Sequence, residues 1–578
     1  MISGKWNFNP PSREELCRRD EIARKFGLSP AVCLLMVRRG ISSDEEVRQF
    51  ISPSWNDMHD PFLYPDMEKA VNRLNLALGN KEKIMIYGDY DVDGTTAVAL
   101  VYRFLEFYTL SSILDYYIPD RYDEGYGISD KAIRYAQDKG ISLVIALDCG
   151  IKAVEKIAFA KTLGIDFIIC DHHKPDDVLP DAVAILNALR TDSTYPYPYL
   201  SGCGVGFKFM HAFAISNNVG FSQLRLMFDY VAVSIAADVV PITGENRVLA
   251  TFGLYRLNYS PSKGLKGIIE VCGLKGKEIT MSDIVFKIGP RINASGRIMN
   301  GRESVDLLLA RDSTSAREKS ESADQYNDDR RELDKKITDQ AYAIIDTDPE
   351  TCNKRIIIIH HPEWHKGIIG IVASRLAEKY YKPVIVFTEA NGHLSGSARS
   401  VTGFDIYRAI ESCKDILVNF GGHPFAAGVT IDGKDFPAFC SRIESYAEEF
   451  MSEEQMTQSL DVDIELRFSD INLKLLKDQK RMRPFGSANQ KPVYLSRQVR
   501  DAGTSKLVGK ELEHIKLDLI DDSTTEVISA IAYGMHRHAE YVKSGKTFDI
   551  CYTLEENNYS KEPNIQLQIL DISIPCEQ

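Results

Sequence analysis

Ile84-Met-Ile-Tyr-Gly-Asp-Tyr-Asp-Val-Asp-Gly94 joins an apolar run to three aspartates at alternate positions, Asp89, Asp91 and Asp93. The apolar run is typical of a buried strand, and the helical periodicity that follows Gly94 indicates a helix. Three carboxylates at the end of a buried strand repel one another unless a cation lies among them, and Mg²⁺ and Mn²⁺ favour such oxygen ligands. A solvated acidic turn explains the same residues equally well, so the rest of the chain has to decide.

The length and composition are those of a multidomain globular protein. A chain of 578 residues predicts three or four domains, and its 44% hydrophobic and 26% charged residues are ordinary values. No stretch approaches the roughly 18 apolar residues of a membrane span, and the N-terminus shows no secretory signal. Eleven cysteines without a Cys-x-x-Cys pair favour reduced thiols in a cytoplasmic protein. The net charge of −13 argues against a generally basic surface but permits a local basic channel.

From Lys83 the hydrophobic pattern alternates between strands and helices. This alternation predicts an α/β fold with a mostly parallel sheet covered on both faces. In such sheets ligands gather at the carboxyl ends of the strands. The expected strands are 84–87, 113–118, 143–147, 167–170 and 183–186, and the expected helices are 95–107, 129–138 and 154–163.

Aspartate and histidine residues follow several of these strands. Asp148 follows the third strand and His172 the fourth, while Asp238 ends an apolar helical stretch. An aspartate in so apolar a segment is costly to bury without a partner, although local hydrogen bonds at a helix end are the simple alternative. A metal explains Asp238 better, because three strand ends supply further ligands.

The expected ligands of two divalent ions are Asp91, Asp93, Asp148, His172 and Asp238, with Asp148 bridging the ions. Such a pair of ions suits phosphodiester hydrolysis, because one activates water and both stabilise the attacking and leaving oxygens. Mixed Asp/His ligation fits Mn²⁺ better than Ca²⁺ and leaves Mg²⁺ open. His173 is at least as well explained as a supporting or core histidine, and Asp171 is expected to orient His172.

Several motifs resemble, in order, those of the DHH phosphoesterase family, and in particular its RecJ branch of single-strand-specific DNA exonucleases. The catalytic motifs are Tyr87–Gly94, Leu147–Gly150, Asp171–His173 and Ala237–Ile242, and the segment Ile288–Arg297 resembles the end of the catalytic domain. Trp364–Leu376, Ser395–Arg399 and Phe420–Gly428 resemble a DHHA1-type second domain. The similarity runs from about residue 80 to residue 495.

This resemblance implies a metal-dependent 5′→3′ exonuclease that hydrolyses single-stranded DNA to 5′-mononucleotides in repair and recombination. It implies two Mn²⁺ or Mg²⁺ ions as cofactors and makes Asp89 a ligand of second rank. The expected partners are single-stranded DNA, a single-strand-binding protein and a helicase, with no membrane and a monomeric chain. The implied substrate-binding residues are Arg121, Arg297, Ser397, Arg399 and His423.

The remaining segments complete the expected domain organisation. Residues 313–346 read as one long charged helix, and five strands in 493–574 suit a small β-barrel, which the resemblance makes an OB-fold. The basic run 474–483 is explained equally well by nucleic-acid binding and by a solvated helix face, and Ala488 stands where the resemblance leads us to expect glycine. The expected divisions are 1–80 (helical extension), 81–312 (DHH catalytic domain), 313–350 (connecting helix), 351–454 (DHHA1-type domain) and 455–578 (OB-fold).

Two alternatives remain open at this point. One is a DHH-family phosphodiesterase acting on short oligonucleotides or cyclic dinucleotides, although such proteins can be much shorter and the barrel favours a longer polymer. The other is a non-catalytic scaffold that binds single strands, whose sign would be substituted ligands. All five expected ligands are present, which argues against the scaffold. No ligand pattern extends from His360, His361 and His365, so these are expected to be structural or to face the substrate.

Overall fold

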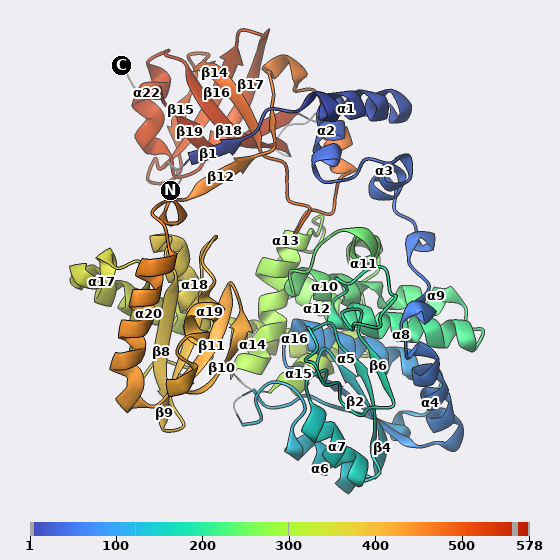
Figure 1. The fold of residues 1–578 in the computed structure, drawn as a ribbon. Helices are drawn as coiled ribbons and strands as arrows, with labels where there is room; N and C mark the ends of the chain where they lie inside the picture. The colour runs from blue at the N-terminus through green and yellow to red at the C-terminus, as the bar shows by residue number, and fades with distance from the viewer. Residues whose placement is uncertain (1–4, 122, 299, 558–563, 576–578) are drawn as a thin grey trace. The chain divides into compact units, whose positions relative to one another are not determined.

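The computed structural model describes residues 5–121, 123–298, 300–557 and 564–575, the side chains at 295, 297, 298 and 349 excepted. The chain forms two compact units (Figure 1). Unit 1 comprises Met1–Pro11, Asp328–Leu476 and Pro492–Gln578, and unit 2 comprises Ser12–Asn327 and Lys477–Lys491. The chain therefore returns to unit 2 for one short segment late in its course.

The sheet of unit 2 has five strands: β2 (Lys83–Gly88), β3 (Leu114–Tyr117), β4 (Ile141–Leu147), β5 (Asp166–Cys170) and β6 (Ala184–Leu186). Strands β2, β4 and β6 are labelled in Figure 1. They lie in the order β3-β2-β4-β5-β6, and every neighbouring pair is parallel. Ile84 and Ile86 of β2 belong to one hydrophobic core, and Met85 and Tyr87 belong to another. Both faces of the sheet are thus buried, as the continuous apolar sequence of β2 requires.

Helices cover the two faces. The core of Ile84 and Ile86 includes α5 (Val92–Leu105), α8 (Gly202–Ser216) and α10 (Phe228–Ala237), and the other core includes α6 (Asp130–Lys139) and α7 (Val154–Thr162). The other helices of unit 2 are α1 (Arg13–Phe26), α2 (Pro30–Arg38), α3 (Asp44–Ile51), α4 (Met67–Asn80), α9 (Phe221–Leu224), α11 (Gly244–Tyr259), α12 (Lys263–Val271), α13 (Met281–Asp283), α14 (Gly289–Ile298) and α15 (Gly301–Leu308). The charged stretch forms α16 (Ser313–Thr347), one long helix as predicted, which passes from unit 2 into unit 1.

Helix α5 begins at Val92, three residues before the predicted start. Asp91 is its N-cap, and the Asp91 carboxylate accepts a hydrogen bond of 3.0 Å from the Gly94 N–H. Gly94 lies inside the first turn, where a Cβ would come within 2.4 Å of the Asp89 carbonyl oxygen. Glycine is therefore needed for the acidic loop to pack against its own helix.

The N-terminal region is not helical throughout, contrary to prediction. Residues Lys5–Phe8 form strand β1, which pairs in parallel with β12 (Ser459–Val462) in unit 1. Trp6 and Phe8, at alternate positions, pack against a buried hydrophobic cluster of unit 1. Four residues are too few for their alternation to be recognised without the partner strand, which explains why this element was missed.

Unit 1 contains another five-stranded sheet, called the second sheet below. Its strands are β7 (Ile357–His360), β8 (Val384–Ala390), β9 (His393–Arg399), β10 (Leu417–His423) and β11 (Ala426–Ile431). Their order is β10-β11-β9-β8-β7, in which only the β7–β8 pair is parallel. The helices of this region are α17 (Pro349–Asn353), α18 (Ile369–Tyr380), α19 (Ile406–Glu411) and α20 (Phe436–Phe450).

A closed β-barrel forms the last part of unit 1. Its strands are β14 (Tyr494–Asp501), β16 (His514–Asp521), β17 (Thr524–Ala532), β18 (Phe548–Glu556) and β19 (Ile565–Ser573). They are joined in the order β14-β18-β19-β17-β16, and pairing of β14 with β16 closes the ring. The five predicted barrel strands are confirmed. Further elements here are β13 (Ile464–Glu465), β15 (Lys506–Val508) and α22 (Ala539–Lys543), and α21 (Leu473–Lys480) begins in unit 1 and ends in unit 2.

The segment Lys477–Lys491, which precedes the barrel strands, belongs to unit 2. Ala488 within it has a φ of +56°, in the left-handed region that favours glycine. The departure seen in the sequence thus falls on a position whose backbone conformation suits glycine. In the basic run that ends here, Lys474, Lys477 and Arg481 are exposed, whereas Asp478 is buried and accepts a hydrogen bond of 2.7 Å from the Ser29 N–H.

Candidate metal centre

The expected ligands converge at one edge of the unit 2 sheet. Because β2, β4 and β5 are neighbouring parallel strands, the loops that follow them meet at their carboxyl ends. These loops supply Asp91, Asp148 and His172, while Asp93 lies in the first turn of α5. Asp238 is the C-cap residue of α10. Four segments that are distant in sequence are thus brought together.

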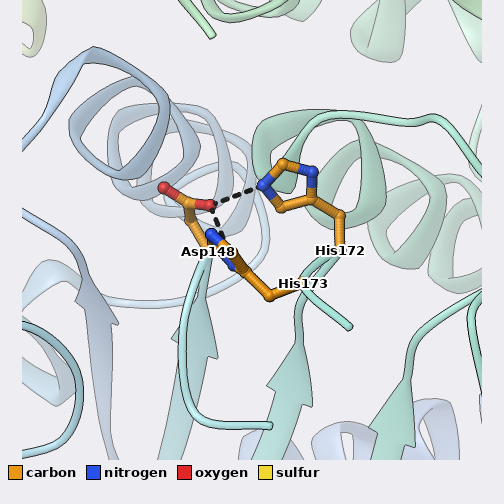
Figure 2. A group of neighbouring side chains, drawn as sticks. All are labelled: Asp148, His172 and His173. Atoms are coloured by element: carbon orange, nitrogen blue, oxygen red, sulfur yellow. Dashed lines mark ion pairs between the residues drawn. The ribbon is translucent and has the colours of Figure 1, made fainter. Parts of the chain in front are cut away.

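The carboxylate and imidazole groups approach one another closely. His172 Nε2 lies 3.1 Å from Asp148 Oδ1, 3.7 Å from Asp238 Oδ2 and 3.9 Å from Asp93 Oδ2. Figure 2 shows the His172 and His173 rings beside the same oxygen of the Asp148 carboxylate, with His173 Nδ1 4.0 Å from Asp148 Oδ1.

Three overlapping groups of three residues could each hold a cation. They are Asp89, Asp91 and Asp148; Asp93, His172 and Asp238; and Asp148, His172 and His173, with the candidate ligand atoms of each group within 4.8 Å of one another. The first two groups share no residue and together contain all five expected ligands. The 3.1 Å approach of Asp148 to His172 joins the two groups. Asp89 therefore belongs to the same group as Asp91, and its lower rank as a ligand stays a prediction.

The electrostatics of the cluster fit a bound cation. Burial, together with the charges of Asp93 and Asp91, raises the pKa of Asp148 well above its ordinary range. The same causes raise the pKa of Asp238 to about 8, and burial lowers the pKa of His172. Asp89 Oδ1, Asp148 Oδ1 and His172 Nε2 are buried atoms without a hydrogen-bond partner among the described residues. A divalent cation would satisfy these atoms and favour the ionised carboxylates.

The N-terminus of α8 holds Asp93 in place. The Asp93 carboxylate accepts hydrogen bonds from the N–H groups of Gly202 (2.7 Å) and Cys203 (2.8 Å) and from Ser234 Oγ (2.7 Å). A Cβ on Gly202 would lie 2.5 Å from Asp148 Cβ, so the helix start also packs directly on Asp148. Sequence reasoning missed these residues, although the glycine-rich start of α8 was a usable signal.

Asp171 orients His173 and not His172, which corrects the prediction. Asp171 Oδ1 lies 2.7 Å from His173 Nδ1, and the Asp171 carboxylate also accepts hydrogen bonds of 3.0 Å from the N–H groups of Ile151 and His173. Burial acts to raise the pKa of Asp171, but the hydrogen bond and charge of His173 lower it. Consecutive side chains point in different directions here, so of the two histidines only His173 brings its ring to the Asp171 carboxylate.

Tyr126 is a second residue that sequence reasoning missed. Its hydroxyl lies 3.1 Å from His173 Nδ1 and donates a hydrogen bond of 3.3 Å to the Asp148 carbonyl, while much of the side chain remains exposed. Tyr126 directly follows the polar loop 119–125, so its position was the available signal. A partly exposed tyrosine therefore lies directly beside the cluster.

Of the expected substrate-binding residues in unit 2, Arg121 lies near the cluster. Its guanidinium stacks over the Tyr90 ring at 4.9 Å from the centroid, and its charge acts on the nearby Asp89 carboxyl. Arg297 is in α14, but its side chain lies outside the described part of the structure. The role predicted for Arg297 therefore stays a prediction.

The other expected substrate-binding residues share one face of the second sheet. Ser397 and Arg399 alternate along β9, and the strand register aligns His423 with Ala426 and Ala426 with Arg399. Arg399 Nη1 donates to Ser397 Oγ at 3.2 Å. A Cβ on Gly370, at the start of α18, would lie 2.9 Å from Ser397 Oγ. A hydroxyl, a guanidinium and a helix N-terminus thus meet at one point, a combination that suits a phosphate.

The histidines of the 360–365 stretch have structural contacts. His361 stacks on Trp364 with ring centroids 5.1 Å apart, and His365 Nδ1 accepts a hydrogen bond of 3.1 Å from the Gly367 N–H. In the described residues they belong to none of the groups that could hold a metal.

Three family models match the chain in consecutive regions. Residues 83–235 match the DHH family, N-terminal domain; residues 353–449 match the DHHA1 domain; and residues 462–571 match the RecJ OB domain. The single-stranded-DNA-specific exonuclease RecJ of Bacillus subtilis is 34% identical, over 99% of this chain and 72% of its own. The Haemophilus influenzae protein of the same name is 31% identical, over 98% of this chain and its full length. The chain belongs to the RecJ family.

Solved RecJ structures agree with this membership. RecJ of Thermus thermophilus in complex with Mn²⁺ superimposes with a TM-score of 0.83, at 24% identity, over 99% of this chain and 80% of that one. A second exonuclease RecJ, bound to manganese, is 30% identical with a TM-score of 0.58 and covers 68% of this chain and 98% of its own. The predicted fold class is confirmed, and the family membership confirms the prediction of a nuclease. No helix among the described residues is long and apolar enough to cross a membrane.

Proposed function

We propose that the chain is a 5′→3′ exonuclease that hydrolyses single-stranded DNA to 5′-mononucleotides by a two-metal mechanism, in DNA repair and recombination. The observation that carries this proposal is the meeting of two potential cation sites at Asp148 and His172. The substrate is supported by the RecJ relatives, which are named single-stranded-DNA-specific exonucleases. The polarity and the cellular role rest on the family resemblance.

We propose Mn²⁺ or Mg²⁺ as the ions, held by Asp91, Asp93, Asp148, His172 and Asp238, with Asp89 in support. RecJ relatives have been solved with Mn²⁺ and with Mg²⁺. Two such ions, when bound, supply an activated water and stabilise the attacking and leaving oxygens of the phosphodiester.

The protein groups around the ligands fix the geometry on which this chemistry depends. The α8 N–H groups and Ser234 hold the Asp93 carboxylate, so its direction does not have to change when substrate arrives. The Asp171–His173 pair places an imidazole beside Asp148, where Asp171 raises the pKa of His173 even though burial opposes that shift. His173 is therefore a candidate for stabilising negative charge on the phosphate.

Unit 1 supplies the surfaces on which we propose that the DNA strand is held. Ser397, Arg399 and the start of α18 are suited to a phosphate, and a Cβ on Gly421 or Gly428 would meet open space. An uncovered backbone there lets a ligand approach the sheet closely. We propose the expected division of labour: hydrolysis in 81–312, substrate binding in 351–454 and nucleic-acid binding by the barrel in 455–578, joined by a connecting helix, with Arg121 helping to place the strand.

The test is a degradation assay with 5′- and 3′-labelled single and double strands in Mn²⁺, Mg²⁺ or chelator. We expect label from the 5′ end of a single strand to appear first as mononucleotide, and we expect chelator to stop the reaction. Early release of 3′ label would contradict the polarity. Hydrolysis of a dinucleotide but not of the long strand would favour the short-substrate alternative, and activity in chelator would exclude the metal mechanism.

A further inference from the structure

Arg247 is a buried arginine that donates five hydrogen bonds to four main-chain carbonyls. It lies on α11 with 3% exposure. Its guanidinium donates to the Phe50 carbonyl at 2.9 and 2.7 Å, and to the carbonyls of Met482 (2.9 Å), Arg483 (2.8 Å) and Arg481 (3.1 Å). Burial lowers the pKa of Arg247 to about 9, so the guanidinium is still charged at neutral pH. One cation thus ties the N-terminal helices to the segment that precedes the barrel.

The segment that Arg247 binds is internally fixed. The Asn489 amide donates to the carbonyls of Met482 (2.9 Å) and Pro484 (2.7 Å), which closes the turn. Arg39 hydrogen-bonds to the Asn489 side chain and donates to the Gln490 carbonyl at 2.7 Å. The turn 482–489 is therefore held by its own hydrogen bonds and by those of Arg247 and Arg39.

This turn reaches the loop that follows Asp238. The Ile242 N–H donates to the Ser487 carbonyl at 2.8 Å. A Cβ on Gly486 would lie 2.4 Å from Ile242 Cδ1, so the turn and the loop are in direct contact. Only three residues separate Ile242 from Asp238.

The loop between them is held at both ends. The Asp238 N–H donates to the Ser234 carbonyl at 2.9 Å, and the Pro241 carbonyl accepts from the Asn246 amide at 3.0 Å. Val239 between them has a φ of +57°, which a β-branched residue adopts only when its surroundings enforce it. The conformation next to Asp238 thus depends on contacts made further along the loop.

We propose that Arg247 is a positioning residue for the metal centre, because it fixes the turn 482–489 that in turn fixes the Asp238–Ile242 loop. The inference rests on the proposed function, since it takes Asp238 as a metal ligand. The segment Lys477–Lys491 lies outside the expected catalytic domain in sequence. In this proposal it nevertheless supports the metal centre. Residues 477–491, which lead into the first barrel strand, thus help to hold the metal site in position.

The test compares the full-length variants Arg247→Lys and Arg103→Lys. Lysine at 247 keeps the charge but makes fewer of the five hydrogen bonds. Arg103 is a matched control, since it too donates to a main-chain carbonyl of unit 2, that of Leu309 at 2.6 Å. Mn²⁺ affinity is measured directly by calorimetry, alongside thermal unfolding and the kcat and KM on a single strand.

We expect Arg247→Lys to weaken Mn²⁺ binding by about 10-fold or more, the scale of removing support from a metal ligand, and to lower kcat with KM unchanged. Arg103→Lys should lower the Tm without changing Mn²⁺ affinity. Equal Mn²⁺ affinity in Arg247→Lys and the wild type would overturn the proposal and leave the proposed function intact. A wild-type chain that binds no Mn²⁺ would instead overturn the proposed function.

A second variant covers the case in which Arg247→Lys does not fold. Gly486→Val leaves Arg247 unchanged but introduces a side chain whose Cβ would clash with Ile242. We expect the same loss of Mn²⁺ affinity, and an unchanged affinity in this variant would overturn the proposal.

Discussion

Asp148 connects the two groups of ligands, and its environment leaves it few other roles. It is 3% exposed, its Oδ1 has no hydrogen-bond partner among the described residues, and its backbone φ of +60° aims the side chain from the end of β4 into the cluster. A carboxylate buried in this way without a cation is unfavourable. Its burial therefore indicates a bound ion more strongly than its identity alone.

Replacement of Asp148 by alanine should abolish hydrolysis and leave strand binding intact. The variant removes the carboxylate that we propose bridges the two ions, so we expect kcat to fall by at least about 10³-fold, at the upper end for loss of one preorganised electrostatic group. Initial rates on a 5′-labelled single strand and a binding isotherm in chelator measure the two effects. Asp176→Ala, at an exposed aspartate, is the control. Turnover close to that of the control would contradict a bridging role.

The metal-free protein should become less stable as the pH rises. Burial and the charges of Asp93 and Asp91 raise the pKa of Asp238 from 3.8 to about 8, so between these values the folded state binds more protons than the unfolded state. The free energy of unfolding then falls as pH increases through this range. Thermal unfolding in chelator from pH 5 to 8.5 should show a decreasing Tm.

Two comparisons identify the cause of that decrease. Asp238→Asn should flatten the pH dependence, because the side chain no longer titrates, and Mn²⁺ should raise the Tm most at high pH, where the ligands are ionised. A Tm that rises with pH in chelator would contradict the raised pKa of Asp238, because the folded state would then bind fewer protons than the unfolded state.

At the scale of elements, the pattern of buried strands was enough to predict the sheet and the barrel. The run from Ile84 is apolar because both faces of β2 are covered, and the alternation in 514–521 reflects a barrel with one buried face. What could not be predicted depends on contacts between distant segments. The support of Asp93 by α8 and the pairing of Asp171 with His173 follow from side-chain directions that no local periodicity encodes.

Helix α8 should tolerate no side chain at its first residue. In Gly202→Ala the new Cβ would lie 2.5 Å from Asp148 Cβ and 2.7 Å from its Oδ1, so the helix start or Asp148 must move. We expect a loss of Mn²⁺ affinity measured by calorimetry, with a folded protein by circular dichroism. Gly79→Ala is the control, because a Cβ at that helical glycine meets open space. An unchanged Mn²⁺ affinity in Gly202→Ala would show that α8 does not define the site.

At the scale of the whole molecule, residues from the two ends of the chain meet in unit 1. Trp6 Nε1 of β1 donates to Asp571 Oδ2 of β19 at 2.9 Å, and Trp6 packs on the cluster of Val462, Leu495 and Cys551. The predicted division into consecutive domains therefore differs from the two units at two places. Strand β1 belongs to unit 1, although the residues that follow it belong to unit 2, and residues 477–491 belong to unit 2, although the barrel that follows them belongs to unit 1.

Trp6→Ala should destabilise unit 1 without affecting the metal site in unit 2. Loss of the half-buried ring and its hydrogen bond should cost about 2 kcal/mol, less than the 3–5 kcal/mol of a fully buried tryptophan. Denaturant unfolding measures this cost, and Asn7→Ala, which loses only an exposed hydrogen bond to Asp461, should change the stability by no more than about 0.5 kcal/mol. Equal stability of the two variants would show that β1 is not an integral strand.

The location of bound Mn²⁺ tests the two-metal centre most directly. Anomalous scattering from a Mn²⁺-soaked crystal should show two peaks about 3.5–4 Å apart. One should lie beside Asp89, Asp91 and Asp148, and the other beside Asp93, His172 and Asp238. A single peak, or peaks that do not flank Asp148, would contradict the two-metal mechanism.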